Sequence, residues 1–392
     1  MPRVADALVV DDDVLAAADR AVDEVLAALA TTPDLVVVFA GGRDTSRLAQ
    51  VGPRVALRSG AAALVGCTAA GVVGDGRGAE GVPAVSVWAA VLPGARLRTF
   101  DLEVLPAADG LAVVGMPTPR GADDPEGADA AVLLLADPYS FPADEFVASA
   151  GARAHGLPFL GGLVSGPGRA GTPRLFVDGR VVERGAVGVV LGGDVSVQPL
   201  VAQGCRPVGP TMTVTAADGP LLVELAGRPA LMKVREVLAG LDPEDQALAT
   251  TGLHVGLAVD EYAEEHELGA FLVRPVLGVE PARGAVAVGE AVELGRTVRL
   301  HVRDAETARE DLRRHLRAAR RGRLRTVDGA LLFTCTGRGA RMLGSSAADV
   351  VAVRDGLGGV PVAGFFAAGE IGPVGSRSHL HGFTASVLAV GA

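Results

Sequence analysis

Short apolar runs and pairs of glycines recur along the chain in one fixed order. An apolar run bounded by turn residues comes first, which is the pattern of a buried strand. A second apolar segment then carries two glycines five positions apart, and a third apolar run closes the unit. The order recurs around three pairs: Gly66 and Gly71, Gly161 and Gly166, and Gly364 and Gly369. It predicts one structural unit that the chain uses three times.

The fold class follows from the segments that lie between these runs. Helical or loop segments that separate buried strands favour an α/β or α+β fold, in which helices flank mixed β-sheets. We therefore expect two domains that contain three related β-α-β-β units, in a strand order that the pattern does not specify. The runs that open the units lie at 35–39, 131–135 and 330–333, and those that close them lie at 84–91, 186–191 and 383–390.

The domain limits are indicated by changes in periodicity. Residues 1–30 are expected to carry an N-terminal helix, because aspartates are available as caps and apolar residues repeat at helical spacing. Near residue 225, strand-rich sequence gives way to another helix. We expect one domain in residues 31–225 and a second in residues 226–392. The apolar positions of the first helix are Val14, Ala18, Val22, Val25 and Leu29.

Composition and charge narrow the class of protein. The chain has 392 residues and is 49% hydrophobic, so it can bury a large core. Its net charge of −10 argues against nucleic-acid binding. We expect no signal peptide and no membrane span, because the chain lacks a basic start followed by an apolar stretch and lacks any long apolar run. Cys67, Cys205 and Cys335 form no zinc or disulfide pattern, which favours a cytoplasmic protein with reduced thiols and no cofactor.

Several segments together resemble one known family, the FIST sensory proteins. The resemblance implies a FIST N domain in residues 31–225 followed by a FIST C domain in residues 226–392. It also implies a soluble ligand-binding sensory module, often fused to signalling domains, for which amino acids have been proposed as ligands. We find no attached output domain, so we expect a separate signalling partner protein. The segments that carry the resemblance are Gly66–Gly71, Gln203–Gly209, Cys335–Gly339, Gly364–Pro373 and His381–Ala385.

Chemically useful side chains are concentrated in the third unit. Gly337-Arg338-Gly339 follows a predicted strand and should precede a helix. Backbone N–H groups and a two-pronged guanidinium would then meet at one turn, which suits a carboxylate or a phosphate. The alternative is a tight glycine turn with an exposed arginine. An acid and two histidines follow further along the same unit: Glu370, His379 and His381.

Other chemistries fit the same residues less well. Glu370, His379 and His381 match no metal-site spacing, so hydrogen-bonded histidines in a pocket are favoured over a metal site. Cys335 or Cys67 could serve a hydrolase or transferase as nucleophile, but free cysteines are more often buried as small hydrophobes. We therefore predict no catalytic residue. A protein-interaction scaffold, as in the F-box relatives of the family, is a further alternative.

We predict a ligand pocket in the third unit, because buried polar groups need partners and this unit combines the most of them. Arg338 would hold a carboxylate of the ligand, and Glu370 with His381 would receive its amine or hydroxyl. Replacing Arg338 by alanine should cost roughly 2–5 kcal/mol of binding and leave the fold intact. The expected lining consists of Cys335, Gly337, Arg338, Gly339, Glu370, His379 and His381, with Cys67 and Thr68 at the wall.

Overall fold

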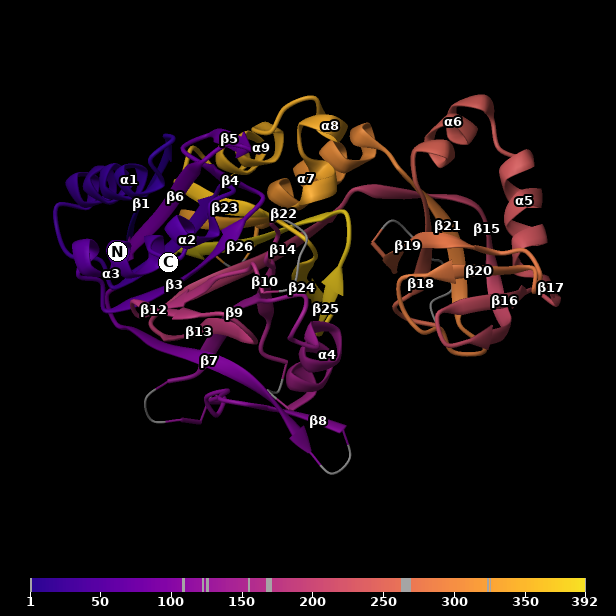
Figure 1. Cartoon of the computed structure of the whole chain (residues 1–392), viewed down its shortest axis with the longest axis horizontal. Coiled ribbons are helices and arrows are strands. Elements are labelled where there is room, and N and C mark those ends of the chain that lie inside the picture. The colour runs from indigo at the N-terminus through magenta and orange to yellow at the C-terminus, as the bar shows by residue number, and fades with distance from the viewer. Residues whose placement is uncertain are drawn as a thin grey trace. The chain divides into compact units, whose positions relative to one another are not determined.

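The computed structural model describes residues 2–107, 110–121, 123–124, 127–153, 156–166, 171–261, 269–322, 324 and 326–391 (Figure 1). The chain divides into two compact units. The first comprises Met1–Val201, Leu312–Leu380 and Thr384–Ala392, and the second comprises Ala202–Asp311 and His381–Phe383. The second unit is thus inserted into the sequence of the first.

Within the first unit, the described residues form three mixed sheets. Sheet 1 has the order β1 (Arg3–Val10), β6 (Ala84–Val91), β2 (Leu35–Gly41), β3 (Ala63–Ala69), β11 (Leu175–Val177), β12 (Arg180–Val182). Sheet 2 has the order β25 (Arg377–His381), β24 (Glu370–Val374), β10 (Phe159–Leu163), β9 (Asp129–Ala136), β13 (Ala186–Gly193), β7 (Ala95–Ala107), β8 (Gly110–Val114). Sheet 3 has the order β14 (Ser196–Gln203), β26 (Thr384–Gly391), β22 (Val327–Cys335), β23 (Val362–Ala367), β4 (Gly71–Gly74), β5 (Arg77–Glu80).

The three sheets share one connectivity, so the repeat seen in the sequence is also present in the fold. In each sheet a parallel pair joined through a helical segment forms the centre: β2 with β3, β9 with β10, and β22 with β23. The closing strands β6, β13 and β26 run antiparallel to the first strand of each pair. The prediction of mixed sheets flanked by helices is confirmed.

The repeats exchange strands in a closed cycle, which the sequence did not reveal. Each repeat contains a hairpin between its second and last strands, and that hairpin joins the sheet of another repeat. The hairpin β4–β5 of the first repeat pairs with β23 of the third, and β24–β25 of the third pairs with β10 of the second. The hairpin β11–β12 of the second repeat pairs with β3 of the first. The structure thus adds an exchanged hairpin before the last strand of each expected β-α-β-β unit.

The first glycine of each pair allows the parallel strands to approach closely. Gly66, Gly161 and Gly364 lie opposite residues of the preceding strand in equivalent register. A Cβ atom at any of these glycines would collide with the carbonyl oxygen of that register partner. Backbone contact of this kind excludes every residue with a side chain. The glycine spacing is therefore a packing requirement of the repeat.

One hydrophobic core is shared by the three sheets of the first unit. Strand residues alternate between faces, so Val37 and Phe39 enter the shared core while Val36 and Val38 pack on the opposite face. The ring centroids of Phe39 and Phe365 lie 5.0 Å apart, and Phe365 comes from the third repeat. Other core residues include Leu133 of sheet 2 and Phe333 of sheet 3. The repeats therefore fold against one another and share their interior.

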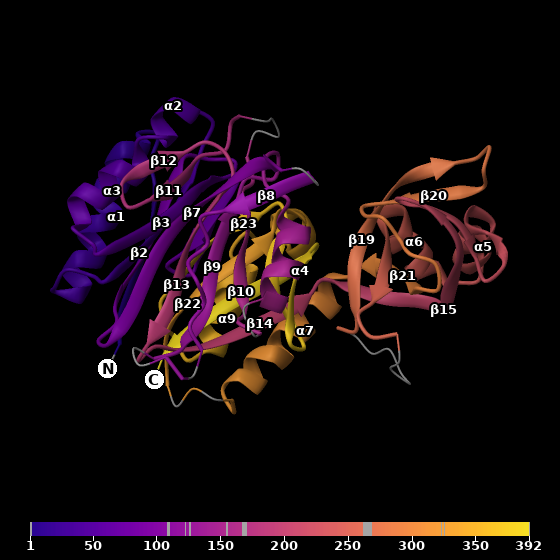
Figure 2. The ribbon, with the colours of Figure 1, turned by 90° about the horizontal axis from the view of Figure 1, so that it is seen from below.

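Helices cover the outer faces of the sheets (Figure 2). The expected N-terminal helix is α1 (Val14–Leu29), and the structure adds strand β1 before it. Its buried face packs on sheet 1, and the oxygen of its cap residue Asp13 accepts from two backbone N–H groups of the first turn. The other helical segments of the first unit are α2 (Thr45–Leu48), α3 (Val51–Ser59), α4 (Ala143–Arg153), α7 (Ala305–Ala319, which begins in the second unit), η1 (Thr336–Arg338), α8 (Ala340–Leu343) and α9 (Ala348–Gly356).

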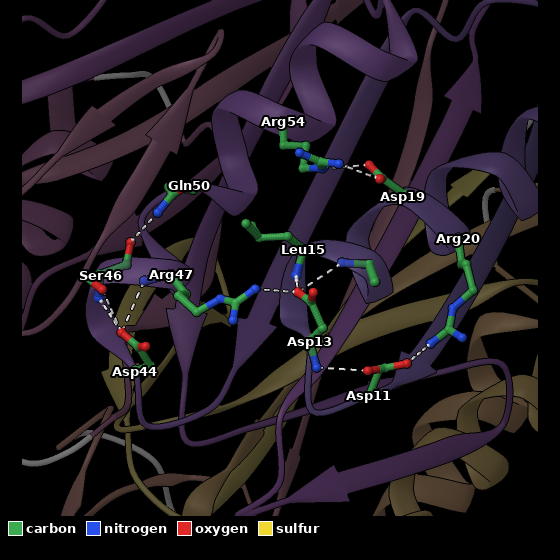
Figure 3. Close-up of polar contacts among 11 residues, drawn as sticks. Asp11, Asp13, Leu15, Asp19, Arg20, Asp44, Ser46, Arg47, Gln50 and Arg54 are labelled. Atoms are coloured by element: carbon green, nitrogen blue, oxygen red, sulfur yellow. Dashed lines mark hydrogen bonds and ion pairs between the residues drawn. The ribbon is translucent and has the colours of Figure 1, made fainter.

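Surface ion pairs join α1 to the following helices (Figure 3). Arg54 binds Asp19 through two hydrogen bonds of 2.7 and 2.6 Å, and Arg47 binds Asp13 at 2.7 Å. Arg58 binds Asp23 in the same two-pronged way. These side chains are exposed, so their contribution to stability is small and is screened by salt.

The second unit contains a single sheet in the described residues, which closes on itself. Its order is β15 (Cys205–Asp218), β21 (Thr297–Arg303), β18 (Leu253–Ala258), β19 (Phe271–Glu280), β20 (Ala285–Val288), β16 (Leu221–Leu225), β17 (Arg228–Pro229). Strand β15 also pairs with β16, which joins the two ends of this order. Helix α5 (Ala230–Ala239) contributes Ala230 and Val234 to the core, and α6 (Pro243–Thr251) follows it.

Candidate functional site

The predicted Gly-Arg-Gly turn lies at the carboxyl end of a parallel strand pair. Strand β22 ends at Cys335, a short 3-10 turn ends at Arg338, and α8 begins at Ala340. Strand β23 ends at Ala367, and Glu370 opens β24. Parallel strands place their carboxyl ends at the same edge of a sheet, which is where open α/β sheets bind ligands. The third repeat therefore brings the arginine and the glutamate together.

Arg338 is fully buried and is paired with an acid that the sequence did not indicate. Its Nε donates to Oδ2 of Asp349 at 2.9 Å, and its Nη2 donates to Oδ1 at 2.8 Å. Thr334 also donates to Asp349, at 2.6 Å. Burial lowers the pKa of the guanidinium, but the charge and hydrogen bonds of Asp349 outweigh burial and raise it. Nη1 has no hydrogen-bond partner among the described residues.

This ion pair changes the expectation that Arg338→Ala would leave the fold intact. Asp349 lies on α9 and is only 6% exposed. Without the arginine, its carboxylate would remain buried without a charge partner, which typically costs about 3–5 kcal/mol. The arginine thus has a structural role, and only its Nη1 lacks a partner among the described residues.

Glu370 is fully buried beside this pair. Its Oε2 accepts from the backbone N–H of Thr384 at 3.0 Å and from the hydroxyl of the same residue at 2.8 Å. Its Oε1 has no hydrogen-bond partner in the part of the chain that the structure describes. Burial raises its pKa to about 8, although Thr384, the charge of Arg338 and the thiol of Cys335 all favour the ionised form. Burial therefore favours the neutral form of Glu370.

The exchanged hairpin of the first repeat covers the turn that carries Arg338. Glu80 on β5 accepts a hydrogen bond from the backbone N–H of Ala340 at 2.8 Å, and Ser346 donates to the carbonyl of Gly78 at 3.0 Å. Gly339 lies against the Glu80 carboxylate, where a Cβ atom would overlap it. At the start of the turn, the Gly337 N–H donates to Sγ of Cys335 at 3.4 Å. Strand exchange thus encloses the site.

The remaining predicted residues lie in other surroundings. Cys67 is buried in the shared core, and burial raises the pKa of its thiol well above the ordinary value. The hydroxyl of Thr68 accepts from the backbone N–H of Arg174 at 3.0 Å, which joins two repeats. His379 lies half-buried on β25, and His381 is buried at the start of the short segment that belongs to the second unit.

Sequence reasoning missed Asp349, Thr334 and Thr384. A signal for Asp349 was present, since an acid in the first turn of a helix shares its buried face with Val350 and Val353. Its partner could not be inferred, because the ion pair joins two segments that only the fold brings together.

A pocket of about 820 Å³ lies between β8 and α4, and neither Arg338 nor Glu370 is among its described lining residues. Its lining is mainly apolar and includes Leu111, Met116, Phe146 and Phe159. We favour the buried cluster as the candidate site, because it combines an unpartnered donor with an unpartnered acceptor, and polar groups of this kind fix the orientation of a ligand. No described helix is long and apolar enough to cross a membrane, and no group of three potential metal ligands occurs among the described residues.

Comparison with known proteins supports the family resemblance over most of the chain. The model of the FIST N domain matches residues 34–228, and that of the FIST C domain matches residues 230–373. The chain is 43% identical to the uncharacterized protein Rv0628c of Mycobacterium tuberculosis (strain ATCC 25618 / H37Rv) over 356 residues, 91% of each chain. It is 42% identical to the uncharacterized protein Mb0898c of Mycobacterium bovis over 355 residues, 91% of this chain and 90% of the relative.

Proposed function

The chain belongs to the FIST family. On this basis we propose that the protein binds a small metabolite with a carboxylate group, such as an amino acid. We further propose that it signals the presence of this metabolite to a partner protein. FIST domains are consistent with a sensory role. The ligand class, the partner and the residues below are our proposal.

One observation supports this ligand class above the others. Arg338 offers an unpartnered N–H donor at Nη1, and Glu370 offers an unpartnered oxygen at Oε1, in one buried cluster. A buried polar group without a partner costs about 1–3 kcal/mol, so a molecule that satisfies both groups regains that free energy on binding. A carboxylate would accept from the arginine, and an ammonium or hydroxyl would donate to the glutamate.

The same geometry suggests how binding would be transmitted within the first unit. Glu370 opens β24, whose hairpin is exchanged into sheet 2, and Gly162 of β10 is its register partner. A ligand that changes the charge of Glu370 would therefore act directly on the pairing between two repeats. It can shift the population of states only by binding one of them more tightly.

The experiment is a thermal-shift screen of amino acids and small carboxylates with the purified full chain. We expect stabilisation by at least one compound, since a ligand that binds only the folded state raises its stability. Glu370→Gln should lose affinity for amino acids, because an amide cannot neutralise an ammonium, and the exposed Glu24→Gln on α1 serves as the control. Absence of stabilisation by every compound would refute the ligand class.

Proton release gives an independent check on the role of Glu370. If an ammonium group binds beside it, the neutral glutamic acid must ionise and release a proton at neutral pH. Titration calorimetry in two buffers of different ionisation enthalpy measures this release. An amino acid that binds without proton exchange would place its ammonium elsewhere.

Cysteine chemistry at Cys335 remains the second candidate. Its sulfur accepts the N–H of Gly337 and lies close enough to Arg338 to raise the pKa of the guanidinium. A positive charge and an N–H donor beside the sulfur are features of nucleophilic cysteines. Labelling with a thiol reagent across pH tests this, and Cys335→Ser identifies the site. Reaction at the ordinary rate of a free thiol would remove this candidate.

A further inference from the structure

The strand end in the first repeat that corresponds to the Arg338 site is an open pocket. The last register pair of β22 and β23 is Cys335 with Ala367, and the last pair of β2 and β3 is Gly41 with Ala69. Directly beyond the latter pair, a pocket of about 320 Å³ is lined by Gly42, Arg43, Ala70, Gly81 and Gly166. It lies within the first unit, and Gly166 follows β10, so residues of two repeats line it.

Glycines make up three of the five described residues that line this pocket. A Cβ atom at Gly81 or at Gly166 would have nothing within 4 Å. The volume corresponds to about ten water molecules at roughly 30 Å³ each. That space suits a compact ligand, and a main-chain wall lets its polar atoms approach the backbone closely.

Among the described lining residues Arg43 is the ionisable one, and no ion pair or hydrogen bond of its side chain occurs in the described part of the chain. Its neighbours in the same region are paired, as Figure 3 shows for Arg47 with Asp13 and Arg54 with Asp19. An arginine without a partner at the carboxyl end of parallel strands is suited to a bound oxyanion.

Asp44 and Glu80 form hydrogen bonds with other groups, and neither forms an ion pair with Arg43 among the described residues. Asp44 turns its Oδ1 to the N–H groups of Ser46 and Arg47 and so caps α2. Glu80 accepts the N–H of Ala340 in the third repeat.

We propose that this pocket binds a small oxyanion, a carboxylate or phosphate group, with Arg43 as its charged contact. The site is separate from that at Arg338 and Glu370. The cyclic repeat thus provides two ligand positions at equivalent strand ends, one enclosed by an exchanged hairpin and one open to solvent.

The test uses inorganic phosphate and succinate as probes, with binding followed by titration calorimetry at low ionic strength. Wild-type protein should bind at least one of the two probes. The probe that binds more tightly shows whether the pocket prefers a phosphate or a carboxylate group. Arg43→Gln should weaken binding about ten- to a hundredfold, the effect of losing a hydrogen bond to a charged group. Gly166→Leu should abolish it, because the leucine would fill the pocket.

Three variants serve as controls. Arg58→Gln removes another exposed arginine, Gly278→Leu adds a side chain at an open glycine in the second unit, and Glu24→Gln removes an exposed charge on α1. All three should bind the probe like the wild type. The proposal is overturned if neither probe binds the wild type, or if Arg43→Gln binds as tightly as the wild type. Should Gly166→Leu fail to fold, Arg43→Gln decides alone.

Discussion

Replacing Glu370 by glutamine should remove a pH dependence from the stability of the first unit. The folded protein holds the proton of Glu370 up to a pKa of about 8, against an ordinary value of 4.5. Between these two values the folded state binds one proton more than the unfolded state, so stability falls as pH rises. The contribution is fully present below pH 4.5 and is lost by about pH 8.

The magnitude follows from the two pKa values. Each unit of difference between the two pKa values corresponds to about 1.4 kcal/mol of unfolding free energy. The whole difference therefore corresponds to on the order of 5 kcal/mol. This is an upper limit, because relaxation of the cluster and entry of water lower the cost of burying the carboxylate. Glutamine keeps an oxygen for Thr384 and never ionises, so the variant should match the wild type at pH 5 and exceed its stability by several kcal/mol at pH 8.

Trp88 provides the assay. It is the only tryptophan in the sequence and is fully buried in the shared core of the first unit, so its fluorescence reports the unfolding of that unit. Urea titrations of the wild type, Glu370→Gln and the control Glu24→Gln at four pH values give the free energies. Parallel curves for wild type and Glu370→Gln between pH 5 and 8 would refute the reasoning.

Three further predictions follow from the buried contacts. Arg338→Ala should destabilise the first unit by about 3–5 kcal/mol, and adding Asp349→Ala should recover part of the loss, as measured by urea titration of both variants. Gly364→Ala should lower the free energy of unfolding by at least about 1–3 kcal/mol or prevent folding, because its methyl group would collide with the carbonyl of the facing strand. A soluble variant of wild-type stability would contradict this prediction. The second unit should lose stability on acidification, since burial lowers the pKa of both His254 and His301 to about 4. Neutral histidines are favoured in its fold, so up to about 3 kcal/mol for each is lost as pH falls from 6.5 to 4, which hydrogen exchange in β18 would detect.

The sequence was informative wherever local periodicity determines structure. The apolar runs predicted β2, β9 and β22 and their closing strands, because a buried strand needs little more than a short apolar segment between turns. The glycine pairs predicted the repeat, since backbone contact leaves one residue type at Gly66 and at Gly364. These signals lie within single segments of the chain.

What the sequence could not provide was the pairing of distant segments. The exchanged strands β4 and β5 span four residues each, too few to carry a register signal of their own. The role of Arg338 depends on Asp349, and the two meet only after α9 has packed beside the turn. The candidate site was therefore predicted as a set of residue types, but its internal partners were not.

The cyclic exchange of hairpins also determines when the molecule can be completed during synthesis. Sheet 3 needs Gly71–Gly74 from the first repeat and Thr384–Gly391 from the last, so it cannot be completed until both segments have been synthesised. Until then β4 and β5 lack their partner strand, and sheet 2 lacks the hairpin that begins at Glu370. A nascent chain of this architecture therefore exposes unpaired strand edges until the later repeats have been synthesised, and such edges are prone to aggregation.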